Sequence, residues 1–249
     1  VHVDIDPSEI HKNKEAHIPI VADVAGVLDE LNKQLADEDI PQIDDWLAQV
    51  AEWKRDNPLV CPDDERLIFP QTAIQELARQ TADRDTFVSV GVGQHQMWAS
   101  QYWNFDHPYT WINSGGLGTM GFSIPAAIGA KAGCPDRMVW AVDGDGCFQM
   151  TAQELVTATV ENIPIKVALL NNSYLGMVRQ WQEMFYDERY SEVFLSKDVP
   201  DYRMWAESMG CEAMRVDDPD EVEGAIAKAN EVDDRPVVID FRVAAEEKV

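Results

Sequence analysis

The sequence is poor in cysteine and has no long apolar run. Its four cysteines, Cys61, Cys134, Cys147 and Cys211, are far apart and form no Cys-x-x-Cys pair. Neither a disulfide framework nor a zinc knuckle is therefore expected. This cysteine usage fits a reducing, cytoplasmic location. No apolar run approaches the roughly 18 residues that span a bilayer, so we expect no membrane partner.

Positive charge is also scarce. The chain has 20 Lys and Arg against 45 Asp and Glu, which gives a net charge of −25 over 249 residues. A surface of this sign repels phosphate, which argues against nucleic acid as a partner. The acids are scattered along the chain, so a disordered acidic tail is not indicated. The charge indicates either a very soluble protein or, as the sharper hypothesis, adaptation to high salt.

The first residues lack both an initiating methionine and a basic, apolar leader. Val1–Asp6 reads as a buried strand, so we expect the chain to begin inside a domain, with no secretory signal. A short strand at Ile18–Val21 and a helix at Val24–Leu35 are predicted to follow. We interpret residues 1–34 as the end of a preceding domain.

Residues 35–69 differ because they contain several prolines and one amphipathic helix, predicted at Asp45–Lys54. This composition is typical of a linker between domains. Trp46 and Trp53 lie at helical spacing on that helix, and we expect them to pack onto a neighbouring surface.

From Pro70 to the end, predicted helices and short apolar strands alternate, which is typical of a doubly wound α/β domain with a parallel sheet. The Thr151…Glu154 spacing is that of a capping box. The predicted helices are Gln71–Thr81, Gln94–Trp103, Gly121–Ala132, Thr151–Glu161, Tyr174–Phe185, Tyr202–Met209 and Pro219–Val232. The predicted strands are Thr86–Val90, Tyr109–Ile112, Met138–Val142, Ile165–Leu170, Glu212–Val216 and Pro236–Val243.

Polar and glycine-rich segments follow three of these strands. They are Gly91–His95, Asp143–Gly146 and Asn171-Asn172. Ligands of open parallel sheets bind at the carboxyl ends of strands, so we expect these segments to share one edge. Asp145 offers a carboxylate and Asn172 an amide oxygen, which suit Mg²⁺ or Ca²⁺. The glycines beside Asp145 leave room for a diphosphate, and the following helix start favours phosphate.

Other interpretations remain open at this point. Gly-Asp-Gly alone is often a plain turn, and Asn-Asn alone is often a helix cap. Gly116–Gly121 also matches Gly-x-Gly-x-x-Gly, and Asp143 lies where a dinucleotide-binding fold places its ribose-binding carboxylate. That match is weak because the preceding strand is short. In addition, Asp143 is followed two residues later by a second aspartate, Asp145, which lies between two glycines.

Gly144-Asp145-Gly146 through Asn171-Asn172 resembles the signature of thiamine-diphosphate enzymes. Gly91–Trp98, Ser114–Phe122 and Leu175–Trp181 resemble the large catalytic subunit of acetolactate synthase, and His2–Lys14 resembles the end of that family's middle domain. The similarity covers nearly the whole chain. It implies a thiamine-diphosphate-binding fold at 70–249 and the tail of an FAD-binding-like domain at 1–34.

The resemblance implies roles for individual residues. Asp145, Asn172 and the carbonyl of Tyr174 are expected to hold Mg²⁺. Gln94 and His95 are expected to contact the diphosphate, Gly118 and Met120 to hold the pyrimidine, and Trp181 with Met177 to shape the second-substrate pocket. On spacing alone, core packing of Met177 and Trp181 stays open. The expected cofactor-binding residues are Val92, Gly93, Gln94, His95, Gly118, Met120, Asp145, Gly146, Cys147, Asn172, Tyr174, Leu175, Gly176 and Met177.

Four residues, Asp4, Ile5, Asp23 and Val24, match positions that contact a structural FAD in the family. The implied reaction condenses two 2-oxo acids with loss of CO₂, with thiamine diphosphate as electron sink. The family assembles as a homodimer or tetramer with sites between subunits, sometimes with a small regulatory subunit.

The family's activating glutamate comes from a domain that nothing in this chain matches, so we assign no catalytic acid or base and expect the chain alone to be inactive. The alternatives are another thiamine-diphosphate-dependent 2-oxo-acid decarboxylase or oxidase, and a non-catalytic remnant module.

Overall fold

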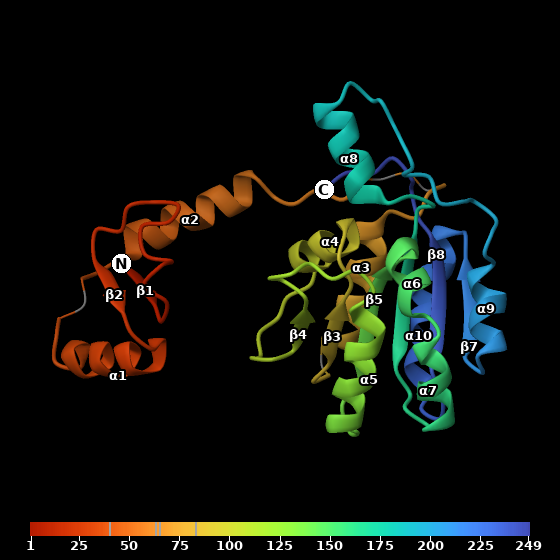
Figure 1. Cartoon of the computed structure of the whole chain (residues 1–249), viewed down its shortest axis with the longest axis horizontal. Helices are drawn as coiled ribbons and strands as arrows, with labels where there is room; N and C mark the ends of the chain where they lie inside the picture. Colours follow the sequence, from red (N-terminus) through yellow and green to blue (C-terminus); the bar gives the residue numbers. More distant parts are fainter. Residues whose placement is uncertain (40, 63, 65, 83) are drawn as a thin grey trace. The chain divides into compact units, whose positions relative to one another are not determined.

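The computed structural model describes residues 1–39, 41–62, 64, 66–82 and 84–249. The chain forms two compact units, Val1–Pro58 and Leu59–Val249 (Figure 1). Their division falls inside the segment interpreted above as a linker. Over the described residues, none of the helices combines the length and the apolar character needed to cross a bilayer.

The first unit contains two short parallel strands and two helices. Strands β1 (His2–Asp4) and β2 (Pro19–Val21) pair with His2 opposite Pro19. Helix α1 (Val24–Leu35) is capped by Asp23, whose carboxylate accepts from the amide of Ala25 at 2.8 Å. Helix α2 spans Asp44–Asp56.

The prediction of a buried strand at Val1–Asp6 was wrong for this chain. Val1 and Ile5 are largely exposed, and β1 is only partly covered. No side chain of α1 or α2 is buried among the described residues. Trp46 and Trp53 pack edge to face, 5.5 Å apart, yet each is more than half exposed. A strand pair and two helices supply too little surface to bury these apolar faces.

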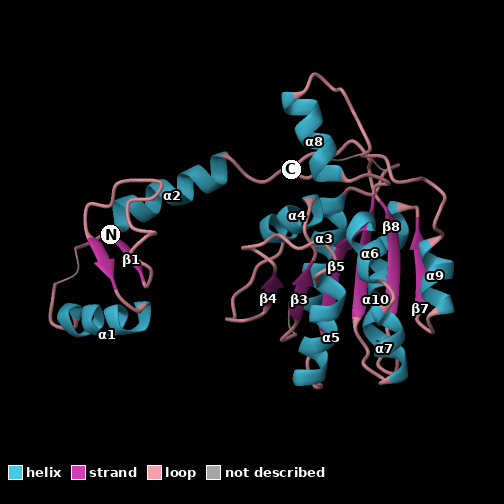
Figure 2. Cartoon of the chain, viewed as in Figure 1, coloured by secondary structure: helices cyan, strands magenta, loops and turns pink. Residues whose placement is uncertain are grey.

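The second unit is built on a six-stranded parallel sheet in the order β4-β3-β5-β6-β8-β7 (Figure 2). The strands are β3 (Phe87–Val90), β4 (Trp111–Asn113), β5 (Val139–Gly144), β6 (Lys166–Asn171), β7 (Glu212–Val216) and β8 (Val237–Arg242). The helices are α3 (Pro70–Thr81), α4 (Gln94–Tyr102), α5 (Ser123–Gly133), α6 (Asp145–Thr151), α7 (Glu154–Val160), α8 (Gly176–Phe185), α9 (Tyr202–Ser208), η1 (Pro219–Glu221) and α10 (Val222–Glu231).

Helices cover both faces of this sheet, which confirms the doubly wound α/β prediction. Trp140 and Val142 of β5 pack in one core with residues of α3, α4 and α10. Val139 and Ala141 of the same strand pack in a second core with residues of α5, α6, α7 and α9. Because successive side chains of a strand point to opposite faces of the sheet, each strand contributes residues to both apolar cores.

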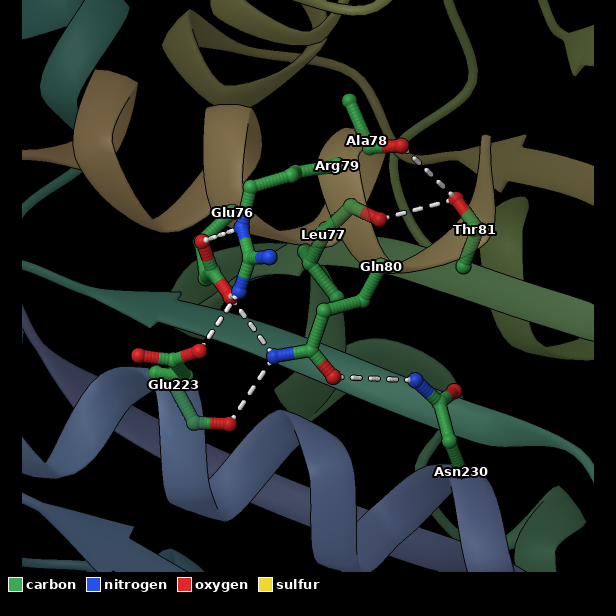
Figure 3. Close-up of polar contacts among 8 residues, drawn as sticks. All are labelled: Glu76, Leu77, Ala78, Arg79, Gln80, Thr81, Glu223 and Asn230. Carbon is green, nitrogen blue, oxygen red and sulfur yellow. Dashed lines mark hydrogen bonds and ion pairs between the residues drawn. The ribbon is translucent and has the colours of Figure 1, made fainter. Parts of the chain in front are cut away.

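A polar network joins α3 to α10 on the first face (Figure 3). Gln80 donates from Nε2 to the carbonyl of Glu223 at 2.9 Å and to Glu76 Oε1 at 2.6 Å. Its own Oε1 accepts from Asn230 Nδ2 at 3.4 Å. The network fixes how α3 lies on α10 beside the buried side chains of Ile74 and Ile226.

The predicted single helix Thr151–Glu161 is wrong. Helix α6 already begins at Asp145 and ends at Thr151, and α7 begins at Glu154. The hydroxyl of Thr151 donates to the carbonyl of Gly121 at 2.8 Å, so it does not cap α7. A capping box requires the Thr151 hydroxyl to bond to a backbone amide of the helix, but here the tertiary contact with Gly121 engages it.

Candidate functional site

The three glycine-rich or polar strand ends lie side by side, as predicted. Strand β3 pairs with β5, and β5 pairs with β6, all in parallel. Their carboxyl ends therefore meet at one edge of the sheet. This edge carries Gly91–Gly93, Asp145 and Asn172.

A cavity with a volume of about 90 Å³ opens at this edge. All the expected cofactor-binding residues line it except Gly118. Gly118 has a φ of 71° in the β4–α5 loop, close to the side chain of Val92. The lining residues are Val92, Gly93, Gln94, His95, Trp98, Met120, Gly144, Asp145, Gly146, Cys147, Leu170, Asn172, Tyr174, Leu175, Gly176, Met177 and Val178.

Asp145 begins α6 and is almost completely buried. Its Oδ1 accepts from the amide of Gly146 at 3.0 Å, whereas its Oδ2 has no partner among the described residues. Burial raises the pKa of Asp145 to about 7, and the amides of Gly146 and Ser173 act in the opposite direction. A buried carboxylate oxygen without a donor is costly, and a bound cation would remove that cost.

Asn172 and Tyr174 follow β6 in a tight turn. Asn172 Oδ1 accepts from the amide of Tyr174 at 3.0 Å, and Ser173 between them has a φ of 66°. The Asn172 amide oxygen and the Tyr174 carbonyl thus belong to residues that line the same cavity as Asp145. Together with the carboxylate, these oxygens match the ligands of a hard divalent cation.

Glycines provide space where the strand ends meet the helices. A Cβ on Gly146 would lie 2.7 Å from Leu175 Cδ2. A Cβ on Gly176 would collide with the side-chain amide of Gln94. Glycine at these two positions therefore lets the Leu175 and Gln94 side chains pack directly against the backbone.

His95 lies under the cavity at the start of α4 and is buried. Its Nε2 is 3.7 Å from Asp143 Oδ1. Burial lowers the pKa of His95 to about 4, so the imidazole is neutral near pH 7. Cys147 donates from Sγ to the carbonyl of Val92 at 3.1 Å.

Met177 and Trp181 lie on one side of α8, as predicted. They border a second, shallower depression with Val178, Gln182, Tyr186 and Arg189. Trp181 is 57% exposed, so core packing does not explain it in this chain. Met177 also lines the main cavity, which makes the two depressions neighbours.

The four residues matched to FAD contacts belong to the first unit. Asp4 ends β1, and the register places it opposite Val21 at the end of β2. Asp4-Ile5 and Asp23-Val24 therefore lie at the same end of the strand pair. Asp4 also accepts from the amide of Asp6 at 2.9 Å.

Three lining residues were missed by the sequence analysis: Trp98, Leu170 and Val178. Trp98 lies one helical turn after Gln94, and Val178 adjoins Met177, so helical periodicity offered a weak signal. Asp143, the carboxylate of the dinucleotide hypothesis, is 0% exposed beneath the cavity. It is also not among the residues that line the cavity, which argues against that hypothesis.

Comparison with known proteins identifies related chains. Residues 91–241 match the family described as thiamine pyrophosphate enzyme, C-terminal TPP binding domain. The chain is 49% identical over 255 residues to the acetolactate synthase large subunit of Corynebacterium glutamicum. It is 48% identical over 256 residues to the acetolactate synthase of Mycobacterium bovis, and 42% identical over 255 residues to the acetolactate synthase isozyme 3 large subunit of Escherichia coli.

Each of these alignments covers 100% of this chain, but only 41%, 41% and 44% of the respective relatives. The chain therefore spans less than half the length of the curated relatives that it matches.

Proposed function

This chain belongs to the thiamine pyrophosphate enzyme family, and we propose that it carries the diphosphate-binding and metal-binding half of an acetolactate synthase site. The proposed reaction condenses pyruvate with pyruvate or with 2-oxobutanoate and releases CO₂, as in branched-chain amino acid biosynthesis. The observation that carries the proposal is the buried, unpartnered Oδ2 of Asp145 beside the Asn172 turn. Similarity over the whole chain supports the choice of synthase.

The cation in this proposal is Mg²⁺, held by the Asp145 carboxylate, the Asn172 amide oxygen and the Tyr174 carbonyl. Thiamine diphosphate, which is another name for thiamine pyrophosphate, supplies the electron sink for loss of CO₂ from a 2-oxo acid. Gln94 and His95 contact its diphosphate, and the backbone at Gly146 and Cys147 lies against it.

The remaining expected site residues position the organic part of the cofactor and the substrate, and exclude water. Val92, Met120, Leu175 and Met177 are apolar and line the cavity. Gly118 offers its carbonyl to the pyrimidine amino group, and Met120 supports the ring. Trp181, next to Met177 on α8, contacts the second 2-oxo acid. An apolar lining strengthens electrostatic interactions inside the site.

We propose that this chain supplies only half of the active site. We assign no catalytic acid or base to it, because the activating glutamate is expected from another domain in a homodimer or tetramer. FAD contacts at Asp4, Ile5, Asp23 and Val24, a small regulatory subunit, a cytoplasmic location and adaptation to high salt are further parts of the proposal. The four cysteines are free, which is compatible with a reducing compartment.

The test is calorimetric titration of the purified chain with thiamine diphosphate in the presence of Mg²⁺. We expect binding to the unchanged chain and none to Asp145→Ala. Asp136→Ala, which removes an exposed carboxylate of the same unit, is the matched control and should bind normally. Equal binding by Asp145→Ala and the unchanged chain would reject the proposed metal site.

A second measurement tests the reaction. The chain alone should form no 2-acetolactate from pyruvate, whereas the chain assembled with the missing domains should form it. Acetaldehyde or acetate as the main product would instead indicate a decarboxylase or an oxidase. Failure of the intact chain to bind the cofactor would indicate a non-catalytic module.

A further inference from the structure

Another hollow lies at the opposite edge of the six-stranded sheet, where β3, β5 and β6 begin. It has a volume of about 620 Å³. Met138, directly before β5, and Lys166, the first residue of β6, both line it. Along β6, roughly 16 Å of strand separates Lys166 from Asn171 at the edge of the candidate site. The hollow shares no lining residue with the cofactor cavity, so the two are separate sites.

Cationic side chains gather around this hollow, although the chain as a whole has 20 Lys and Arg against 45 Asp and Glu. They come from the segment before β3, the last turn of α5, the segment before β5 and the start of β6. The four cations are Arg84, Lys131, Arg137 and Lys166. The excess of acids over the whole chain is therefore not reproduced at this place.

Three carboxylates also line the hollow, and they leave most of this positive charge without a direct partner. Asp85 pairs with Arg137. Asp136 and Asp233 are exposed. Over the described residues, neither of these two carboxylates forms an ion pair with a lysine of the hollow. The lysines therefore face the hollow without an acidic neighbour in direct contact.

Lys166 is the most deeply buried of the four cations, with 5% of its surface exposed. Its Nζ donates to the carbonyl of Val232 at 3.0 Å. That carbonyl caps the carboxyl end of α10, where the partial negative charge of the helix favours a cation. An ammonium group has three donors, and the described part of the chain supplies this one with no carboxylate partner. Lys166 is thus a buried cation that lacks a counter-ion.

The surroundings of Lys166 oppose its charge despite the contact with α10. Burial, followed by Lys131 and Arg84, lowers the pKa of Lys166 to about 8, and only Asp233 acts in the opposite direction. A buried charge is costly unless it is paired. An anion bound between these cations would supply the counter-ion and offset their mutual repulsion.

Lys131 is held in place on another wall of the hollow. Its Nζ donates to the carbonyl of Pro135 at 2.6 Å and to the carbonyl of Arg137 at 2.7 Å. These bonds fix the segment before β5 against the last turn of α5. Since an ammonium group has three donors, one donor of Lys131 remains for a ligand. The position of this ammonium group is set before any ligand binds.

We propose that the hollow binds a small oxyanion, the phosphate or carboxylate group of a small molecule, through Lys166, Lys131 and Arg84. Lysine binds such groups as a point charge, and hydrogen bonds between ions are stronger than those between neutral groups. Arg84 is exposed and attracts the anion from solvent. The proposal involves neither Asp145 nor Asn172, so it does not depend on the proposed function.

The size of the hollow indicates that the oxyanion belongs to a larger molecule. Its volume lies within the range of about 300–1,000 Å³ that is typical of small-molecule sites. Ile163, Pro164 and Val232 add apolar surface beside the cations. An organic molecule with one anionic group matches this combination of charged and apolar walls.

The experiment is calorimetric titration of the purified chain, without Mg²⁺, with inorganic phosphate and separately with succinate at constant ionic strength. We expect saturable binding of one equivalent of at least one probe. Lys166→Met should lower that affinity at least about tenfold, because it removes a charged hydrogen-bond donor. The matched control Lys228→Met removes an exposed lysine that pairs with Glu212 and should leave the affinity unchanged.

Further arms identify the anion and separate this site from the cofactor cavity. The probe that binds more tightly assigns a phosphate or a carboxylate group. Asp145→Ala should bind it as the unchanged chain does. If Lys166→Met fails to fold by circular dichroism, Lys131→Met replaces it, with the same expected loss. No saturable binding of either probe, or equal binding by the folded lysine variant of the hollow, would overturn the proposal.

Discussion

Gln94 Nε2 donates a hydrogen bond to Gln180 Oε1 over 2.8 Å, although the two residues are 86 positions apart. Both side chains are buried. Gln94 Oε1 in turn accepts from Asn172 Nδ2 at 3.4 Å. These hydrogen bonds between side-chain amides connect α4, the turn after β6, and α8. We propose that these three segments bind diphosphate, metal and substrate, respectively.

Gln180→Ala should loosen this arrangement. Gln94 Nε2 would keep only its 3.2 Å bond to the carbonyl of Glu247. Losing a buried hydrogen bond of this kind costs about 1–2 kcal/mol. We expect affinity for thiamine diphosphate with Mg²⁺ to fall about tenfold by calorimetry, with the circular dichroism spectrum unchanged. Gln182→Ala is the control on the same helix, because Gln182 bonds to Ser191 and does not line the main cavity. An equal loss of affinity in both variants would contradict the prediction.

Lys166→Met should stabilise the fold near neutral pH. Lys166 is buried on β6, and burial, followed by Lys131 and Arg84, lowers its pKa from 10.5 to about 8. Below pH 8 both folded and unfolded chains carry this proton, so the full penalty for burying the charge applies. Between pH 8 and 10.5 the unfolded chain binds more protons, so the free energy of unfolding rises with pH. Above that range the penalty is gone.

The measurement is the difference in urea unfolding free energy between Lys166→Met and the unchanged chain across pH 7 to 11. Below pH 8 the variant loses the bond to the carbonyl of Val232 but also loses the buried charge, for a net gain of about 1–2 kcal/mol. This gain should decrease toward pH 10.5. A difference that does not vary with pH would show that Lys166 is not the titrating group.

Gly91→Ala should destabilise the second unit, because the added Cβ would collide with Asp143 Oδ1 and lie 2.8 Å from His95 Nε2. Overpacking of this type costs about 1–3 kcal/mol. Gly129→Ala is the matched control in α5, where a Cβ meets nothing within 4 Å. It should stabilise the helix by about 0.5–1 kcal/mol. Thermal unfolding midpoints that shift in opposite directions would support the geometry, and a stabilising Gly91→Ala would refute it.

Arg215→Leu should be strongly destabilising. Arg215 Nε donates to Oδ2 of the fully buried Asp240 at 3.1 Å, and Asn171 Nδ2 donates to its Oδ1 at 2.8 Å. Removing the cation leaves a buried carboxylate with one donor, at a cost of about 3 kcal/mol. Arg203→Leu breaks only an exposed pair with Glu207 and should cost less than about 1 kcal/mol. Chemical denaturation of both variants gives the comparison, and similar small losses would show that Asp240 does not need Arg215.

The sequence predicted the alternating order of strands and helices of the second unit, because apolar periodicity and glycine-rich turns are local features. The sequence also predicted that Asp145 and Asn172 lie at one edge of the sheet, because the carboxyl ends of parallel strands lie at the same edge. It was wrong about the Thr151 capping box, where a contact with Gly121 replaced the local bond. Val1–Asp6 was predicted as buried although this chain offers little to cover it.

The sequence by itself thus determined the fold class, the family and the edge of the sheet that carries the candidate site. Only the tertiary structure decided that His95, Asp143 and Cys147 meet beneath the cavity and that Gln94 bonds Gln180. Short motifs specify which groups are available and on which element they lie. Which side chains then touch depends on strand order, register and helix packing, and these are set by the burial of the whole apolar surface.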